Sequence, residues 1–144
     1  MRSSLVAVAL LSWVASPALA QQKSAAGKPT IYDLTIQADG AAYTGTMELM
    51  VAGGKVSGAM NITQPTEITG KPAGTSKAGQ IKLDFPYRMV QRGCDGQIAM
   101  DIKMPAKAGA GPAAGTVSIT GCGRTDANKL PGTIELKPQA AKKK

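Results

Sequence analysis

The chain has 144 residues, of which 43% are apolar, 18% charged and 3% aromatic, and its formal net charge is +8. This length allows one domain at most, and the apolar content is that of a globular protein rather than of a disordered chain. Histidine is absent and there are two cysteines. The commonest general base is therefore missing, and zinc ribbons and iron–sulfur clusters are excluded.

The first twenty residues have the three regions of a secretory signal peptide. Arg2 supplies a positive start, residues 5–14 form an almost unbroken apolar run, and Pro17 precedes an Ala-Leu-Ala cleavage pattern at 18–20. The alternative is an uncleaved membrane anchor, but the run is shorter than the ~20 apolar residues that span a bilayer. We therefore expect a cleaved signal peptide at 1–20, no transmembrane segment, and export. The destination is the periplasm if the host is Gram-negative, and otherwise the exterior.

After residue 20 the chain is too rich in glycine and proline for long helices. All 17 glycines and eight of the nine prolines lie there, and the longest stretch free of both, residues 30–39, has ten residues. An average helix needs ~11–12 residues. Between these breaks apolar residues occupy alternate positions, which predicts strands with one buried face. The predicted inward-facing residues are Tyr32, Leu34, Ile36, Tyr43, Met47, Leu49, Val51, Val56, Met60, Ile62, Ile81, Leu83, Phe85, Ile98, Met100, Ile102, Met104, Val117, Ile119, Ile134 and Leu136.

A weak repeat accompanies these strands. A glycine followed by alternating apolar residues recurs six times, at Gly45, Gly58, Gly79, Gly96, Gly115 and Gly132. Each glycine lies an even number of positions from the apolar residues that follow it, so it is expected to point inward near the start of a strand. Inward glycines let a sheet coil sharply, as a closed barrel requires. The alternative is that they leave room for a ligand at the barrel mouth.

Together with residues 31–37 and a short segment at 66–71, the pattern gives about eight strands. The predicted fold is all-β, a small antiparallel up-and-down β-barrel of about eight strands with one disulfide. A β-sandwich is the alternative, because strand count alone does not separate the two. We expect a flexible N-terminal segment at 21–30, a single barrel domain at 31–137 and a basic C-terminal tail at 138–144.

Cys94 and Cys122 form the only cysteine pair, and in an exported domain such a pair predicts a structural disulfide. Alternation along the strands places the two cysteines on different faces. Cys94 falls in step with the inward residues of its strand, whereas Cys122 falls in step with the outward residues of its strand. Two regular strands would then point the thiols to opposite faces. We therefore expect a β-bulge at Gly121 or at the Asp95-Gly96 step.

The chemistry that the sequence allows is limited. No phosphate-binding loop or dinucleotide motif occurs, and the nine acidic residues are spread singly. Without histidine, a nucleophilic triad lacks its usual base. We expect a protein that is not an enzyme and needs no metal and no cofactor.

The segment at 85–94 concentrates the features of a recognition surface. Phe85, Tyr87, Arg88 and Arg92 lie within it, beside the cysteine at its end, and Pro86 must interrupt strand pairing because it has no N–H to donate. Tyrosine and arginine are enriched at binding hot spots. These four side chains are the predicted ligand or partner contacts. The alternative is a bulged strand with solvated arginines.

The predicted function is binding by a small exported barrel. The first hypothesis is a carrier or sensor of a small apolar or amphipathic ligand. The second is a protein-binding module, such as an inhibitor of an exported hydrolase. The third is an envelope-associated structural protein held by charge. An anionic envelope polymer is a further possible partner through Lys142, Lys143 and Lys144. Nucleic acid is not expected, because basic and aromatic residues do not interleave.

Overall fold

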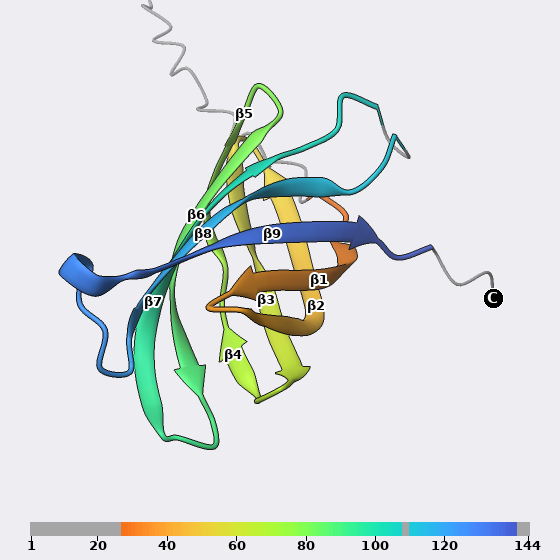
Figure 1. Cartoon of the computed structure of the whole chain (residues 1–144). Coiled ribbons are helices and arrows are strands. Elements are labelled where there is room, and N and C mark those ends of the chain that lie inside the picture. Colours follow the sequence, from red (N-terminus) through yellow and green to blue (C-terminus); the bar gives the residue numbers. More distant parts are fainter. Residues whose placement is uncertain (1–26, 108–109, 141–144) are drawn as a thin grey trace, which may run out of the picture.

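The computed structural model describes residues 27–107 and 110–140 (Figure 1). It contains nine strands and one short 3₁₀ turn at Asp126–Asn128. The strands are β1 (Thr30–Ala38), β2 (Ala41–Ala52), β3 (Lys55–Gln64), β4 (Ile68–Gly70), β5 (Ala73–Lys77), β6 (Gln80–Met89), β7 (Cys94–Lys103), β8 (Ala113–Gly121) and β9 (Leu130–Pro138). The predicted signal peptide and Lys142, Lys143 and Lys144 lie outside the described residues. Within the described ranges, no helix is long and apolar enough to cross a membrane.

The strands close into one antiparallel barrel. Apart from β4 and β5, each strand pairs with its neighbour in the chain, and β9 pairs with β1 to complete the ring (Figure 1). β4 and β5 share a single position between β3 and β6, so the ring has eight positions for nine strands. The predicted antiparallel barrel is confirmed, and the sandwich alternative is excluded because a sandwich would leave strands at open edges. The separate strand β5 was not predicted.

Alternation along the strands fills the barrel interior with apolar side chains. Nearly all of the predicted inward-facing residues are buried, and none of the described buried side chains is polar or charged apart from the two tyrosine hydroxyls of Tyr32 and Tyr87. Val51 is an exception, since it lies at the end of β2 and is 40% exposed. Tyr43, Met104 and Ile119 are only partly buried and pack against the core. The interior is therefore a packed core and not a hollow.

The inward glycines lie where neighbouring strands approach most closely. A Cβ built on Gly58 would lie 1.8 Å from the carbonyl oxygen of Glu48, and one on Gly115 would lie 1.9 Å from that of Asp101. Real Cβ atoms do not come that close to backbone, so the tight coiling of the barrel depends on these residues lacking a side chain. The prediction of an inward strand position is wrong for Gly79, which lies in a turn and has a φ of +77°.

Two aromatic rings cover glycines on adjacent strands. A Cβ on Gly96 would lie 2.5 Å from the ring of Tyr87, its direct cross-strand partner, and one on Gly70 would lie 2.9 Å from the ring of Phe85. Each ring therefore fills the space that the glycine leaves open. The two ring–glycine contacts account for the presence of two aromatic residues at adjacent inward positions of β6.

Pro86 lies where one side of β6 loses its partner. Pairing with β7 continues through Pro86 and Gln97 without a break. On the other side, β4 pairs with residues 87–89 and β5 with residues 80–83, which leaves 84–86 without a partner. The interruption predicted for Pro86 therefore occurs on the β4–β5 side only. Pro72, which is fully buried, lies in the chain segment between β4 and β5.

The disulfide between Cys94 and Cys122 is present, with Cα atoms 5.3 Å apart. The predicted β-bulge is wrong, because β7 and β8 pair in unbroken register from Gly96–Gly121 to Lys103–Ala114. The parity conflict disappears because Cys122 lies just beyond β8 in a turn. Gly121, Cys122 and Gly123 all have positive φ angles, which swing the thiol back toward Cys94. A positive φ is less favourable for Cys122 than it would be for glycine, because Cys122 has a Cβ atom.

The connecting segments gather at two opposite ends of the barrel. We call one the arginine end, formed by the turns at 39–40, 65–67, 90–93 and 122–129. The other is the lysine end, formed by the connections at 53–54 and 78–79, by residues 104–107 and 110–112, and by the chain segments at 27–29 and 139–140. β1 starts and β9 finishes at the lysine end (Figure 1).

Candidate functional site

A pocket of about 530 Å³ opens at the arginine end. It lies above the packed core and is bounded by all four turns of that end. The residues that line it are Ile36, Asp39, Tyr43, Ile62, Pro65, Thr66, Ile68, Tyr87, Met89, Gln91, Arg92, Ile98, Ile119, Gly121, Cys122, Arg124 and Leu130. Antiparallel barrels commonly place ligand sites at their mouths.

The pocket floor is apolar. Ile62, Ile68 and Ile98 are buried side chains of the core, and Met89 and Leu130 are partly buried around them. These side chains are flexible or branched aliphatics that offer contact area without hydrogen bonds. The floor therefore suits an apolar group of a ligand.

The pocket rim carries charge. Arg124 donates from Nη2 to Oδ2 of Asp39 at 3.4 Å, which joins the turn after β8 to the turn after β1. Arg92 belongs to the β6–β7 turn, and no described carboxylate lies within 4.0 Å of it. The rim thus presents two guanidinium groups and one carboxylate above an apolar floor. Guanidinium groups bind carboxylates and phosphates through paired hydrogen bonds.

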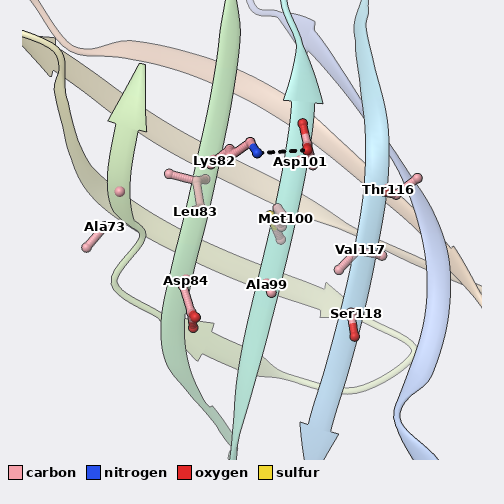
Figure 2. Close-up of a pocket in the computed structure, with 11 residues that line it drawn as sticks. Ala73, Lys82, Leu83, Asp84, Ala99, Met100, Asp101, Thr116, Val117 and Ser118 are labelled. Atoms are coloured by element: carbon pink, nitrogen blue, oxygen red, sulfur yellow. Dashed lines mark ion pairs between the residues drawn. The ribbon is translucent and has the colours of Figure 1, made fainter. Parts of the chain in front are cut away.

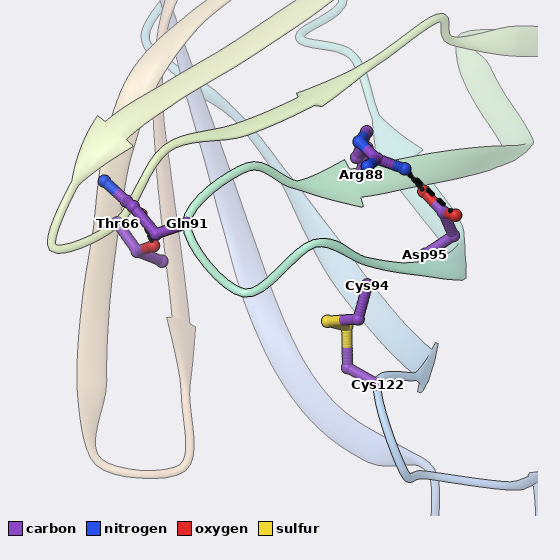
Figure 3. Close-up of a disulfide and its surroundings, with 6 residues drawn as sticks. All are labelled: Thr66, Arg88, Gln91, Cys94, Asp95 and Cys122. Atoms are coloured by element: carbon purple, nitrogen blue, oxygen red, sulfur yellow. Dashed lines mark hydrogen bonds and ion pairs between the residues drawn. A yellow bond between two sulfur atoms is a disulfide. The ribbon is translucent and has the colours of Figure 1, made fainter.

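Hydrogen bonds fix the rim turns to one another. Gln91 accepts from the hydroxyl of Thr66 and, through Oε1, from the backbone N–H of Glu67 at 2.9 Å. The N–H of Val90 donates to the carbonyl of Glu67 at 3.0 Å. Figure 3 shows Thr66 and Gln91 side by side, with the disulfide on the other side of the β6–β7 turn. Covalent and hydrogen-bonded links therefore hold the mouth in a defined shape.

Tyr87 is the group of the site whose ionisation is perturbed. Its ring is 5% exposed and packs over Gly96, and burial raises the pKa of its hydroxyl above the usual value of 10. The positive charge of Arg124 lowers this pKa and the nearby Tyr43 raises it, both to a lesser extent. Tyr87 is therefore a neutral hydroxyl at physiological pH, at the boundary between the apolar floor and the charged rim.

We expect the stability of the fold to decline at alkaline pH in a way that depends on Tyr87. Because its pKa is raised by folding, its contribution is complete below about pH 10 and is lost as the pH rises through the folded value. Urea unfolding at a series of pH values should give a shallower alkaline decline for Tyr87→Phe than for the wild type. An identical decline in both proteins would contradict this assignment.

The four predicted contact residues do not form one cluster. Phe85 is 1% exposed and belongs to the core, while Tyr87 lies at the pocket and Arg92 on its rim. Arg88 lies on the outer face of β6, where its Nη1 pairs with Oδ1 of Asp95 at 3.0 Å (Figure 3). Both partners are largely exposed, so this ion pair contributes little to stability. Of the predicted set, the structure brings only Tyr87 and Arg92 to the pocket.

Several pocket residues were missed by sequence reasoning. Asp39, Tyr43, Arg124 and Leu130 come from strands and turns far from residues 85–94 in the chain. The closure of the barrel by β9 and β1 brings them together. One signal was available, since all three arginines after residue 20 lie in or next to hairpin turns at one end of the predicted strands.

A second hollow of about 640 Å³ lies on the outer face of β5 to β8. Figure 2 shows that small side chains such as Ala99 and Ser118 form its base, and that Lys82 reaches toward Asp101 at 3.9 Å. Leu83, Met100 and Val117 point to the other side of the sheet, into the core. Its charged groups are Lys82, Asp84 and Asp101, of which Lys82 and Asp101 pair with each other, and all three side chains are accessible to solvent. This trough has no buried polar group that would orient a ligand.

The described residues contain no group of three His, Cys, Asp or Glu side chains that could hold a metal ion. In the same part of the chain, every buried side-chain nitrogen or oxygen has a hydrogen-bond partner or contact with solvent. Comparisons with protein-family models, curated proteins and solved structures give no match. The functional argument therefore rests on the pocket at the arginine end.

Proposed function

We propose that this protein is a non-catalytic binding protein whose pocket at the arginine end takes a small amphipathic ligand with an anionic group. The observation that carries the proposal is the layering of the pocket. An apolar floor of core side chains lies under a rim that bears Arg92 and Arg124. The apolar part of a ligand would contact the floor, and its carboxylate or phosphate would contact the guanidinium groups.

The size of the pocket supports a small ligand. Its volume of about 530 Å³ falls within the range of roughly 300–1,000 Å³ that is usual for small-molecule sites. Because the barrel interior is packed, the ligand would bind at the mouth rather than along the barrel axis. Ligand entry would then require no opening of the barrel, since the pocket already meets solvent at the turns.

We propose further that the chain works after export. The disulfide supports an oxidising compartment, because such bonds persist outside the reducing cytosol. The signal-peptide pattern at 1–20 supports the same conclusion. In a Gram-negative host this compartment is the periplasm.

A protein partner is the second candidate. Val90 is 44% exposed at the start of the β6–β7 turn, two residues before Arg92. An exposed apolar residue beside an arginine is typical of the centre of a protein interface. In this case the turn would insert into an acidic cleft, as an inhibitor of an exported hydrolase would.

The ligand class can be tested with probes that differ only in charge. We expect decanoate to bind and to raise the melting temperature, and the matched cation decyltrimethylammonium not to do so. The double variant Arg92→Gln/Arg124→Gln should bind decanoate at least about tenfold more weakly, because truncated hot-spot residues cost ~2 kcal/mol. Isothermal titration calorimetry measures both affinities. The unfolding free energy of the double variant should stay within ~0.5 kcal/mol of the wild-type value.

Arg88→Gln is the matched control, since Arg88 lies on the outer face beside Asp95 and should leave decanoate binding unchanged. Native mass spectrometry of protein purified from its own host then identifies a retained ligand by its added mass. If decanoate and the cation bind equally, or if the double variant binds like wild type, the proposed site is wrong. Loss of a protein partner upon Val90→Ser, with decanoate binding unaffected, would favour the second candidate.

A further inference from the structure

The basic side chains of the barrel are sorted between its two ends. Six lysines lie in the connections of the lysine end or in the strand residues next to them, and no Asp or Glu occurs in residues 27–31, 51–56, 76–81, 102–114 or 137–140. These lysines are Lys28, Lys55, Lys77, Lys103, Lys107 and Lys137. The described segments of this end therefore carry lysines and no acidic residue of their own.

The arginine end has a different charge balance. Its turns contain three acidic residues, Asp39, Glu67 and Asp126, against three basic ones, Arg92, Arg124 and Lys129. The net charge of these turns is therefore zero. The excess of positive charge is therefore concentrated at the lysine end and is not spread evenly over the barrel.

The lysines of the lysine end are available to an external partner. All six are exposed. Lys137 pairs with Glu135 at 3.2 Å, whereas no described carboxylate lies within 4.0 Å of the other five. Like charges held together in this way repel each other, and an anionic partner removes that repulsion.

Exposed apolar side chains lie among these lysines. Val51, at the tip of β2, is 40% exposed, and Ile31, near the start of β1, is 45% exposed. They are two of the three large apolar side chains that are exposed in the described part of the chain. A basic face that also bears apolar side chains is the composition that binds an anionic lipid surface, where lysines contact headgroups and apolar groups enter the interface.

We propose that the lysine end docks onto an anionic lipid bilayer, and that the pocket at the arginine end then faces away from it. The geometry favours a flat surface over a linear polyanion. The lysines come from five separate segments spread around one end of the barrel, whereas a linear polymer would follow a groove or a stripe. β9 also finishes at this end, so Lys142, Lys143 and Lys144 follow in the sequence from the docking face.

Vesicle flotation tests the proposal on the chain from Gln21 onward, which contains all nine strands. We expect this chain to float with vesicles of equal parts phosphatidylglycerol and phosphatidylcholine, and not with phosphatidylcholine alone. Each lysine near an anionic surface is worth roughly a fivefold gain in affinity, so Lys55→Gln/Lys77→Gln/Lys107→Gln should bind about 100-fold more weakly. High salt should have the same effect.

The matched control is Lys71→Gln/Lys82→Gln/Lys129→Gln, which removes the same charge from exposed positions outside the lysine end. It should lose less than about fivefold. Amine-reactive labelling should show Lys55, Lys77 and Lys107 protected by vesicles and Lys129 still reactive.

Three results would overturn the proposal. One is an equal loss of binding in the control variant, which would mean that only net charge matters. Another is loss of binding when the chain is shortened to Ala140 while the three-lysine variant of the lysine end binds like wild type, which would assign binding to the C-terminal lysines alone. The third is equally tight binding of soluble polyphosphate, which would point to a polyanion and not a bilayer.

Discussion

Replacing Gly58 with alanine is expected to destabilise the barrel by about 3 kcal/mol, the upper part of the range for overpacking. The new Cβ would lie 1.8 Å from the carbonyl oxygen of Glu48 and 3.3 Å from the Cα of Leu49 on the paired strand. These are backbone atoms within a continuous ladder, so no side-chain rotation relieves the contact. β2 and β3 would have to separate locally. Urea unfolding of the purified variant measures the loss.

Ala59→Val is the control for Gly58→Ala. Ala59 is the next residue of β3, it is exposed on the outer face, and valine favours strands. We expect this larger side chain to change stability by no more than ~0.5 kcal/mol. If Gly58→Ala were as stable as Ala59→Val, the close approach at Gly58 would not be a requirement of the fold.

Removal of the disulfide is also expected to lower the free energy of unfolding by a large amount. Cys94 and Cys122 are 28 residues apart, and closing a loop of that length contributes roughly 3–4 kcal/mol in the chain-entropy model. For a domain of about this size, 1 kcal/mol corresponds to roughly 4 °C, so Cys94→Ala/Cys122→Ala should melt about 12–16 °C lower. Because Cys122 also lines the pocket, this variant should bind decanoate less tightly.

Reduction provides the internal control for the disulfide. Wild-type protein unfolded in the presence of a strong reductant should match the double alanine variant, and the variant should not respond to reductant. Wild-type protein that keeps its full stability after complete reduction would show that the bond is not what holds the β8–β9 turn against β7.

Most of the barrel could be predicted because its strands obey a simple period. In β6, for example, Ile81, Leu83 and Phe85 alternate with exposed residues, and the structure buries each of them. β5 was missed because its sequence, Ala-Gly-Thr-Ser-Lys, has no large apolar residue to mark an inward face. The predicted bulge failed for a different reason. Parity applies only while residues stay in a strand, and Cys122 has already left β8.

The pocket was less predictable than the strands. Arg92 and Tyr87 were recognised because they lie close together in the chain. Asp39 and Arg124, which are 85 residues apart, meet only through the pairing of β1 with β9. Parity also distinguishes Tyr87 from Arg88, since adjacent residues of a strand face opposite sides. Applying that rule within residues 85–94 would have placed Arg88 on the outer face.

The pairing of β1 with β9 also governs the order of events during folding. β9 is the last of the nine described strands in chain order, and it must pair with the first, roughly a hundred residues earlier, before the ring closes. Contacts between such distant segments form slowly, because a long loop must be ordered before any bond rewards it. Until then β1 and β8 present open edges that can pair with other chains. The chain is therefore most prone to aggregate while β9 has not yet paired with β1 and β8.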